Sequence, residues 1–94
     1  MAPKYADKRT EQFAAGLRVT AFFGFEAQAN RRLFVLQSAP HLSALRAMQS
    51  NRLETLSGNR AGQYSIRINR QWRICFTWPD GDFEPSNIEI VDYH

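Results

Sequence analysis

The sequence predicts an α+β fold, in which N-terminal helices cover one face of a small twisted antiparallel β-sheet. Ninety-four residues suffice for one domain, so we expect a single unit over residues 1–94. The spacing of apolar residues changes near residue 50, from the helical period of about 3.6 to the strand period of about 2. Helices that precede a run of strands are typical of α+β architecture.

The first half of the chain carries the helical pattern. Its clearest segment places Ala29, Leu33 and Leu36 at the spacing of one helix face, which predicts an amphipathic helix. A proline follows this segment and a glycine follows the segment before it, so both helices have an end signal. The predicted helices span residues 7–15 and 26–38, with a further helical turn within residues 41–48.

The second half alternates between apolar and polar residues, as a half-buried strand does. A turn at residues 79–82 is expected because proline presets φ and glycine accepts a positive φ. A further turn is expected at residues 57–60. The predicted strands span residues 52–56, 63–69, 71–78 and 87–93.

Alternation also assigns a face to each side chain in the strands. Trp72, Ile74 and Phe76 share the apolar face that the helices should cover. Arg67 and Arg73 lie on the opposite face, either to meet a ligand or simply to be solvated. Cys75 shares that side, but its apolar surroundings in sequence favour a buried and unreactive thiol.

Arginine dominates the basic residues, supplying ten of the twelve. Its planar guanidinium pairs with phosphate in bidentate fashion, so an anionic partner such as a nucleic acid is one interpretation. An ordinary solvated basic face is the other. Eight arginines fall within residues 31–73, against the single acid Glu54, and five acids with no Lys or Arg fall within residues 74–94.

Several kinds of site can be set aside. One cysteine and two distant histidines match no metal-ligand spacing and no Cys/His nucleophile pattern, so we expect no metal and no cofactor. Residues 57–62 lack the Gly-Lys-Ser/Thr ending of a phosphate-binding Walker loop, and a plain turn is the simpler interpretation. An enzyme of this sequence would work with side chains alone.

The candidates for such chemistry are Arg73 and the final residues Asp92, Tyr93 and His94. Two carboxylates, those of Asp92 and of the last residue itself, favour the protonated imidazolium of His94, which suits a general acid. The simpler alternatives are a frayed end and a surface Arg73 paired with Glu89 or Asp92. Because Asp92 shares the parity of buried positions, we expect a twist or bulge near the end of the last strand. That irregularity should bring Asp92, Tyr93 and His94 to the uncovered face of the sheet, next to Arg73.

The segments NRLETLSGNRAGQYSIRINRQWRICFTW and IEIVDYH closely resemble the HigB-like branch of the RelE/ParE toxin superfamily. The resemblance implies a microbial-RNase-like fold and ribosome-dependent cleavage of mRNA by metal-free transesterification. It also implies a helix-turn-helix antitoxin of the HigA kind as partner.

The resemblance also implies roles for individual residues. Arg73 matches the family's phosphate-binding arginine, and Asp92, Tyr93 and His94 match its terminal trio, with His94 as the acid. Relatives can carry a histidine and a lysine where this chain has Glu54 and Ser57, so Glu54 becomes the candidate base and cleavage is expected to be weaker. The RNA- or phosphate-binding candidates are Arg52, Arg60, Arg67 and Gln71.

Two rival functions stay open on the sequence. A ParE-like toxin would share the fold but bind DNA gyrase without catalysis, and a passive binder would block the ribosomal A site without cutting. The sequence shows no signal peptide and no apolar stretch long enough to span a bilayer. We therefore expect a cytoplasmic protein with no membrane partner.

Overall fold

The structure is a computed structural model, and it describes residues 2–92. Its three α-helices and four strands confirm the predicted α+β class for that part of the chain. The helices are α1 (Lys8–Ala14), α2 (Glu26–Ser38) and α3 (Leu42–Ala47), and three short 3-10 helices are η1 (Thr20–Phe22), η2 (Gln49–Asn51) and η3 (Gly58–Arg60). The strands are β1 (Glu54–Thr55), β2 (Gln63–Arg67), β3 (Trp72–Thr77) and β4 (Ser86–Asp92).

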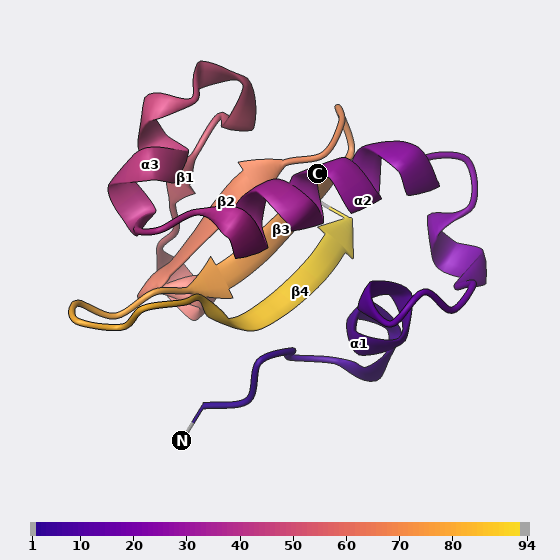
Figure 1. Ribbon diagram of the computed structural model, residues 1–94, viewed down its shortest axis with the longest axis horizontal. Coiled ribbons are helices and arrows are strands. Elements are labelled where there is room, and N and C mark those ends of the chain that lie inside the picture. The colour runs from indigo at the N-terminus through magenta and orange to yellow at the C-terminus, as the bar shows by residue number, and fades with distance from the viewer. Residues whose placement is uncertain (1, 93–94) are drawn as a thin grey trace.

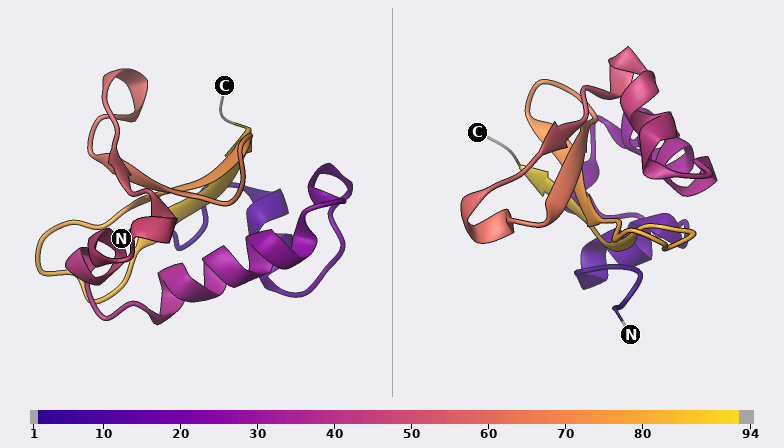
Figure 2. Two further views of the ribbon diagram at one scale, coloured as in Figure 1. Left: turned by 90° about the horizontal axis from the view of Figure 1, so that it is seen from above. Right: turned by 90° about the vertical axis from the view of Figure 1, so that its left-hand side faces the viewer.

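The described strands form one antiparallel sheet in the order β1-β2-β3-β4. Helices α2 and α3 run along one side of this sheet, and α1 lies beside the outer edge of β4 (Figures 1 and 2). The other side carries no α-helix among residues 2–92 (Figure 2). We call these two sides the helix face and the open face.

The main core lies between the helix face and the helices. Ala29, Leu33 and Leu36 of α2 are buried there, which confirms the predicted stripe. Ile74 and Phe76 of β3 are fully buried against them, as alternation predicted. The aromatic ring of Phe22 joins this core through edge-on contacts with two other rings, an arrangement that aromatic pairs favour.

The open face holds a smaller apolar cluster of Leu56, Cys75 and Val91, all buried. Burial raises the pKa of the Cys75 thiol, so the neutral form is favoured. This confirms the expectation of a buried cysteine and gives the physical reason why its thiolate is disfavoured. The open face is therefore packed around Cys75, with the polar residues Ser65 and Glu89 directly opposite it on the two neighbouring strands.

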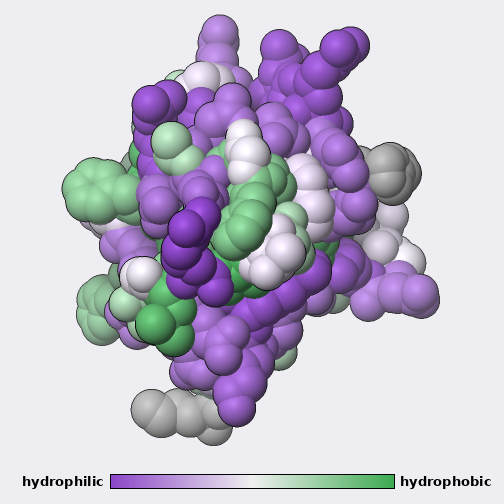
Figure 3. All heavy atoms as spheres, turned by 90° about the vertical axis from the view of Figure 1, so that its right-hand side faces the viewer, coloured by the Kyte–Doolittle hydropathy of each residue, from purple (hydrophilic) through white to green (hydrophobic). Residues whose placement is uncertain are grey.

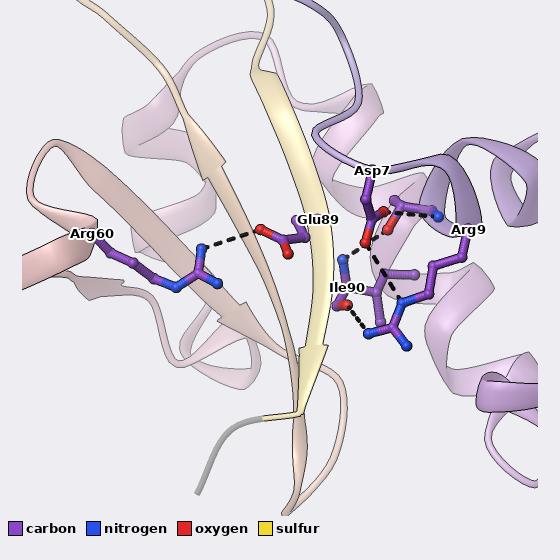
Figure 4. Close-up of polar contacts among 6 residues, drawn as sticks. Asp7, Arg9, Arg60, Glu89 and Ile90 are labelled. Atoms are coloured by element: carbon purple, nitrogen blue, oxygen red, sulfur yellow. Dashed lines mark hydrogen bonds and ion pairs between the residues drawn. The ribbon is translucent and has the colours of Figure 1, made fainter.

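The outer edge of β4 is covered by the N-terminal segment. Tyr5 forms a parallel bridge with Ile88, and the neighbouring backbone N–H of Ala6 donates to the Ile88 carbonyl at 2.9 Å. Farther along, the buried hydroxyl of Thr10 accepts a hydrogen bond from the Ile90 N–H at 3.0 Å. The Arg9 Nη2 donates to the Ile90 carbonyl at 3.3 Å, so α1 takes the place of a fifth strand here (Figure 4).

A β-bulge interrupts β4, but not where the sequence suggested. The pairing with β3 shifts between Cys75 and Thr77, where Asn87 adopts a positive φ of 52°. Asn87 is the extra residue, and its side chain donates to the Thr77 hydroxyl at 3.1 Å. The prediction of a bulge near Asp92 is wrong for the described residues, because the pairing is regular from Cys75 through Trp72.

The first strand is shorter than the predicted residues 52–56. Arg52 adopts a left-handed conformation with φ 46° and ψ 54°, which ends the extended backbone before Glu54. The preceding Asn51 is fully buried: its Oδ1 accepts from Arg32 Nη1 at 2.8 Å, and its Nδ2 donates to the Leu45 carbonyl at 3.1 Å. The buried amide thus fixes the path of the chain as it enters β1.

Some apolar side chains remain on the surface. Leu17, Phe23 and Phe34 are 58%, 47% and 72% exposed and lie after α1, before α2 and on α2. On the side of the molecule that faces right in Figure 1, apolar areas alternate with polar ones (Figure 3). No helix within residues 2–92 has the length and apolar character needed to cross a membrane.

Candidate active site

A basic cleft opens where β1, the β2–β3 turn and the end of α3 meet. Its volume is about 690 Å³, which falls within the rough range of 300–1,000 Å³ typical of small-ligand sites. Among the described residues, five arginines and one glutamate line it, so positive charge is concentrated there. The charged lining residues are Arg46, Arg52, Glu54, Arg67, Arg70 and Arg73.

Arg73 is the buried arginine of the basic cleft, with its side chain 9% exposed. Its Nε donates to the Ser65 hydroxyl at 2.7 Å, and its Nη2 donates to the carbonyls of Ser65, at 3.3 Å, and of Arg52. These contacts come from β2 and from Arg52, which precedes β1 and is separated from it by Leu53, so they fix the plane of the guanidinium. The prediction that Arg73 lies on the face opposite the helices is confirmed.

Glu54 completes the surroundings of Arg73. Its Oε1 lies 3.2 Å from Arg73 Nη1, and its own side chain is 51% exposed. The pairing of β1 with β2 sets Glu54 opposite Ser65, so both side chains share the open face with Arg73. Among residues 2–92, the acid at ion-pair distance from Arg73 is Glu54, so the expected surface pairing of Arg73 with Glu89 or Asp92 is not found in that part of the chain.

Glu89 pairs instead with Arg60. The distance from Arg60 Nη1 to Glu89 Oε1 is 3.2 Å (Figure 4). The same nitrogen lies 3.1 Å from Gln63 Oε1. Arg60 borders a neighbouring hollow with Glu54 and is not among the residues that line the basic cleft. Its predicted role in phosphate binding stays a prediction.

The β2–β3 turn forms another wall of the cleft. Asn69 Oδ1 accepts hydrogen bonds from the N–H groups of Gln71, at 2.9 Å, and Trp72, at 2.8 Å, which fixes the turn. Arg67 Nε donates to the Asn69 carbonyl at 3.1 Å, so the guanidinium extends toward the turn. Arg70 is exposed at the tip. The end of β2 and the turn therefore each present one arginine, Arg67 and Arg70, to the same opening.

Asp92 does not lie on the open face beside Arg73, as the sequence had suggested. The register sets Asp92 opposite Trp72 and Val91 opposite Arg73. Directly opposed residues share a face, so Asp92 begins on the helix face, at the exposed end of β4. Its Oδ2 accepts a hydrogen bond from Gln71 Nε2 at 3.1 Å.

The remaining members of the predicted trio, Tyr93 and His94, lie outside the described residues. Their roles therefore stay predictions. Within residues 2–92, no three His, Cys, Asp or Glu side chains are grouped so that they could hold a metal ion.

Sequence reasoning missed four residues that shape the cleft. Ser65 and Asn51 act through buried hydrogen bonds, and a small polar residue inside an apolar pattern was the signal for Ser65. Arg46 and Arg70 belong to the cleft only because the fold brings α3 beside the β2–β3 turn. The spacing of Arg46 and Arg70 in the sequence does not indicate that the two residues line the same cleft.

Comparison with known proteins places the chain among bacterial toxins. A family model described as the RelE-like toxin of the type II toxin-antitoxin system HigB matches residues 5–94. The toxin HigB-1 of Vibrio cholerae serotype O1 is 39% identical over 83 residues, covering 86% of this chain and 87% of that protein. The endoribonuclease HigB of Proteus vulgaris is 37% identical over 65 residues, covering 69% and 67%.

A solved structure supports the fold independently. A chain in the YoeB-YefM complex from Staphylococcus aureus aligns over 100% of this chain and 97% of its own length, with a TM-score of 0.53 and 18% identity. At that identity the likeness concerns the fold alone. The family match and the two sequence relatives carry the assignment: this chain belongs to the HigB-like family of RelE-like toxins from type II toxin–antitoxin systems.

Proposed function

We propose that the chain is a ribosome-dependent endoribonuclease that cleaves mRNA and thereby inhibits translation. The observation that carries the proposal is Arg73, a buried guanidinium held in a fixed plane within a cleft lined by four further arginines. Catalysis of phosphoryl chemistry depends on cations that are already in position when charge develops on the phosphate. Arg73 meets that need without any rearrangement of its own.

The reaction is a transesterification within the RNA backbone. The ribose 2′-oxygen attacks the adjacent phosphorus in line, a base accepts the 2′-hydroxyl proton, and the P–O5′ bond breaks as an acid protonates the leaving oxygen. Arg73 stabilises the non-bridging oxygens of this phosphate. The arginines at the mouth of the basic cleft hold neighbouring phosphates of the same strand.

The acid and base come from the residues that the family resemblance assigned. His94 is the acid, Asp92 and Tyr93 support it, and Glu54 is the base candidate. Gln71 contacts Asp92, so it either orients that carboxylate or touches the RNA directly. The proposal draws support from the Proteus vulgaris relative, which is named an endoribonuclease.

An antitoxin is the second partner in the proposal. Family members belong to toxin–antitoxin systems, and the Staphylococcus aureus structure contains YoeB with YefM. We propose a HigA-like helix-turn-helix antitoxin that neutralises this chain in the cytoplasm. The exposed Leu17, Phe23 and Phe34 offer apolar area for such a protein on the helix side, and the basic cleft offers charge on the other.

The test is mRNA cleavage on purified translating ribosomes, read by mapping new 5′ ends. We expect cleavage by the wild-type chain and a loss of about a hundredfold or more with Arg73→Gln, the usual cost of removing one preorganised charge donor. Arg18→Gln is the matched control, because Arg18 is an exposed arginine stacked on Phe23 and does not line the basic cleft. A variant that lacks His94 tests the predicted acid.

Each result decides between the candidate functions. Cleavage that needs Arg73 and His94 supports the proposal as stated. Cleavage that survives the loss of His94 keeps the nuclease and moves the acid to another residue. Blocked translation without new 5′ ends would replace the nuclease by a passive A-site binder, and unaffected translation would redirect the search to DNA gyrase.

A further inference from the structure

The ion pair between Glu54 and Arg73 is unequal in how its two members are held. The Arg73 guanidinium is nearly buried and has fixed hydrogen bonds to Ser65 and to the Arg52 carbonyl. The Glu54 side chain is 51% exposed and extends from a strand of only two residues. A rotation about the Glu54 side chain can therefore move the carboxylate into solvent while Arg73 keeps its place.

The pair is also weak as a source of stability. Attraction between ions is screened where one partner is exposed to water, and such pairs typically contribute little to stability. The contacts to Ser65 and Arg52 would remain if Glu54 moved away. The fold therefore does not depend on this carboxylate for the position of Arg73.

The arginines around this ion pair indicate a role for the Glu54 carboxylate. The register sets Arg67 directly opposite Arg73, and like charges in that arrangement repel. Arg46, Arg52 and Arg70 add further positive charge to the same cleft. A carboxylate oxygen beside Arg73 Nη1 supplies the negative group that such a site attracts, and it has the hydrogen-bonding geometry of a phosphate oxygen.

We propose that Glu54 is a displaceable counter-ion, which occupies the phosphate position on Arg73 in the ligand-free protein and yields it to a phosphate of the RNA. The proposal rests on the proposed function, because it takes RNA as the anion. It assigns Glu54 a regulatory role that differs from that of a base. A base must stay beside the 2′-hydroxyl during cleavage, whereas a counter-ion must leave Arg73 before the phosphate can bind.

The two roles predict different results for Glu54→Gln: the counter-ion predicts tighter RNA binding, and the base predicts slower cleavage. The amide keeps the size of the side chain but removes the charge that competes with phosphate. We expect the dissociation constant for a single-stranded RNA of about ten nucleotides to fall on the order of tenfold at low salt, as for the loss of one nearby like charge. Fluorescence anisotropy of a labelled RNA measures it without ribosomes, and single-turnover cleavage on ribosomes then measures the chemical step.

Two further variants separate local competition from net charge. Glu11→Gln removes one carboxylate from an exposed position of α1, away from the basic cleft, and should change the dissociation constant by less than about twofold. Glu54→Asp keeps the charge but is one methylene shorter, so its carboxylate reaches Arg73 less well. We expect its RNA affinity to lie between that of the wild type and that of Glu54→Gln.

The outcomes are distinct. Tighter RNA binding by Glu54→Gln supports the counter-ion whether or not the cleavage rate changes, and a slower single-turnover rate would show that Glu54 is also the base. Unchanged or weaker binding, or equal effects of Glu54→Gln and Glu11→Gln, overturns it. If the wild type cleaves but Glu54→Gln binds no tighter, the nuclease stands and the counter-ion fails. If the wild type does not cleave and Glu54→Gln still binds RNA more tightly, the counter-ion stands and the nuclease fails.

Discussion

The two edges of the sheet are built in opposite ways. The β4 edge is closed, because Tyr5 pairs with Ile88 and the side chains of Arg9 and Thr10 bond both backbone groups of Ile90. Figure 4 shows the Arg9 contact, which Asp7 supports with an ion pair of 3.5 Å. The β1 edge consists of two exposed residues and opens into the basic cleft.

The β4 edge is built to stabilise the fold, whereas the β1 edge is built to leave room for a ligand. At the β4 edge, backbone groups are satisfied by the chain itself, and little is left for a partner to bind. At the β1 edge, a left-handed Arg52 and a half-exposed Glu54 surround a charged opening. Changes at the first edge should therefore lower stability, and changes at the second should lower ligand binding or catalysis.

The largest expected effect belongs to Arg73→Lys on the inner strand β3, where one residue serves both the site and the fold. Lysine keeps the charge but cannot bond Ser65 and the Arg52 carbonyl together, so both the site and its anchoring are changed. We expect the cleavage rate to fall about a hundredfold and the free energy of unfolding to fall by about 1–3 kcal/mol. Ribosomal cleavage and urea denaturation measure the two effects. A fall in stability with full activity would show that Arg73 belongs to the scaffold alone.

The next test compares one threonine on each edge. Thr10→Val removes the hydroxyl that accepts the Ile90 N–H and leaves that buried donor unsatisfied, at a cost of about 1–3 kcal/mol. Thr55→Val on exposed β1 should change stability by less than about 0.5 kcal/mol. Thermal and urea unfolding give both values. Equal losses at the two positions would contradict the contrast between the edges.

A third test concerns the packed middle of the open face. Burial raises the pKa of the Cys75 thiol in the folded protein, whereas a thiol in an unfolded chain has a pKa of about 8.5. The neutral thiol therefore contributes its full share to the free energy of unfolding below that pH, and this contribution is lost as the pH rises. Above that pH, the free energy of unfolding of the wild type should fall with rising pH relative to that of Cys75→Ala, as measured by urea denaturation at a series of pH values. Parallel pH curves for the two proteins would show that the thiol ionises freely in the fold.

The smallest expected effects belong to the outer arginines of the cleft. Arg46→Gln or Arg70→Gln should weaken RNA binding about threefold and reduce the salt slope by about 0.7, the value for one phosphate contact on a single strand. Stability should hardly change, since both side chains are exposed. Arg31→Gln, at an exposed position of α2, is the matched control, and an equal effect there would indicate non-specific attraction.

The sequence predicted most of the fold because periodicity reports which face of an element is buried. The α2 stripe, the strand faces and the buried Cys75 all follow from local patterns. The short β1 was missed because RLETL alternates like a strand, while the buried Asn51 that diverts the chain acts through tertiary contacts. Local pattern could not predict that.

The candidate site was predicted only in part, for the same reason. Arg73 stood out because a charged residue interrupts an apolar strand, but its acidic neighbour depends on strand register. Register also explains why Asp92 was placed on the wrong face: parity pointed to the helix face, and the assumed bulge lies at Asn87 instead. The resemblance to the family identified residues without fixing their geometry.

The hydrogen bonds between α1 and β4 also have a consequence for the order of folding. The Thr10–Ile90 hydrogen bond joins residues 80 positions apart. Contacts of such high sequence separation carry a large loop-closure entropy and slow the folding of small domains. While the chain is being synthesised, α1 has no strand to dock on until β4 is available. The docking of α1 on β4 should therefore be among the last events of folding, so the domain stays incompletely folded until β4 has been translated.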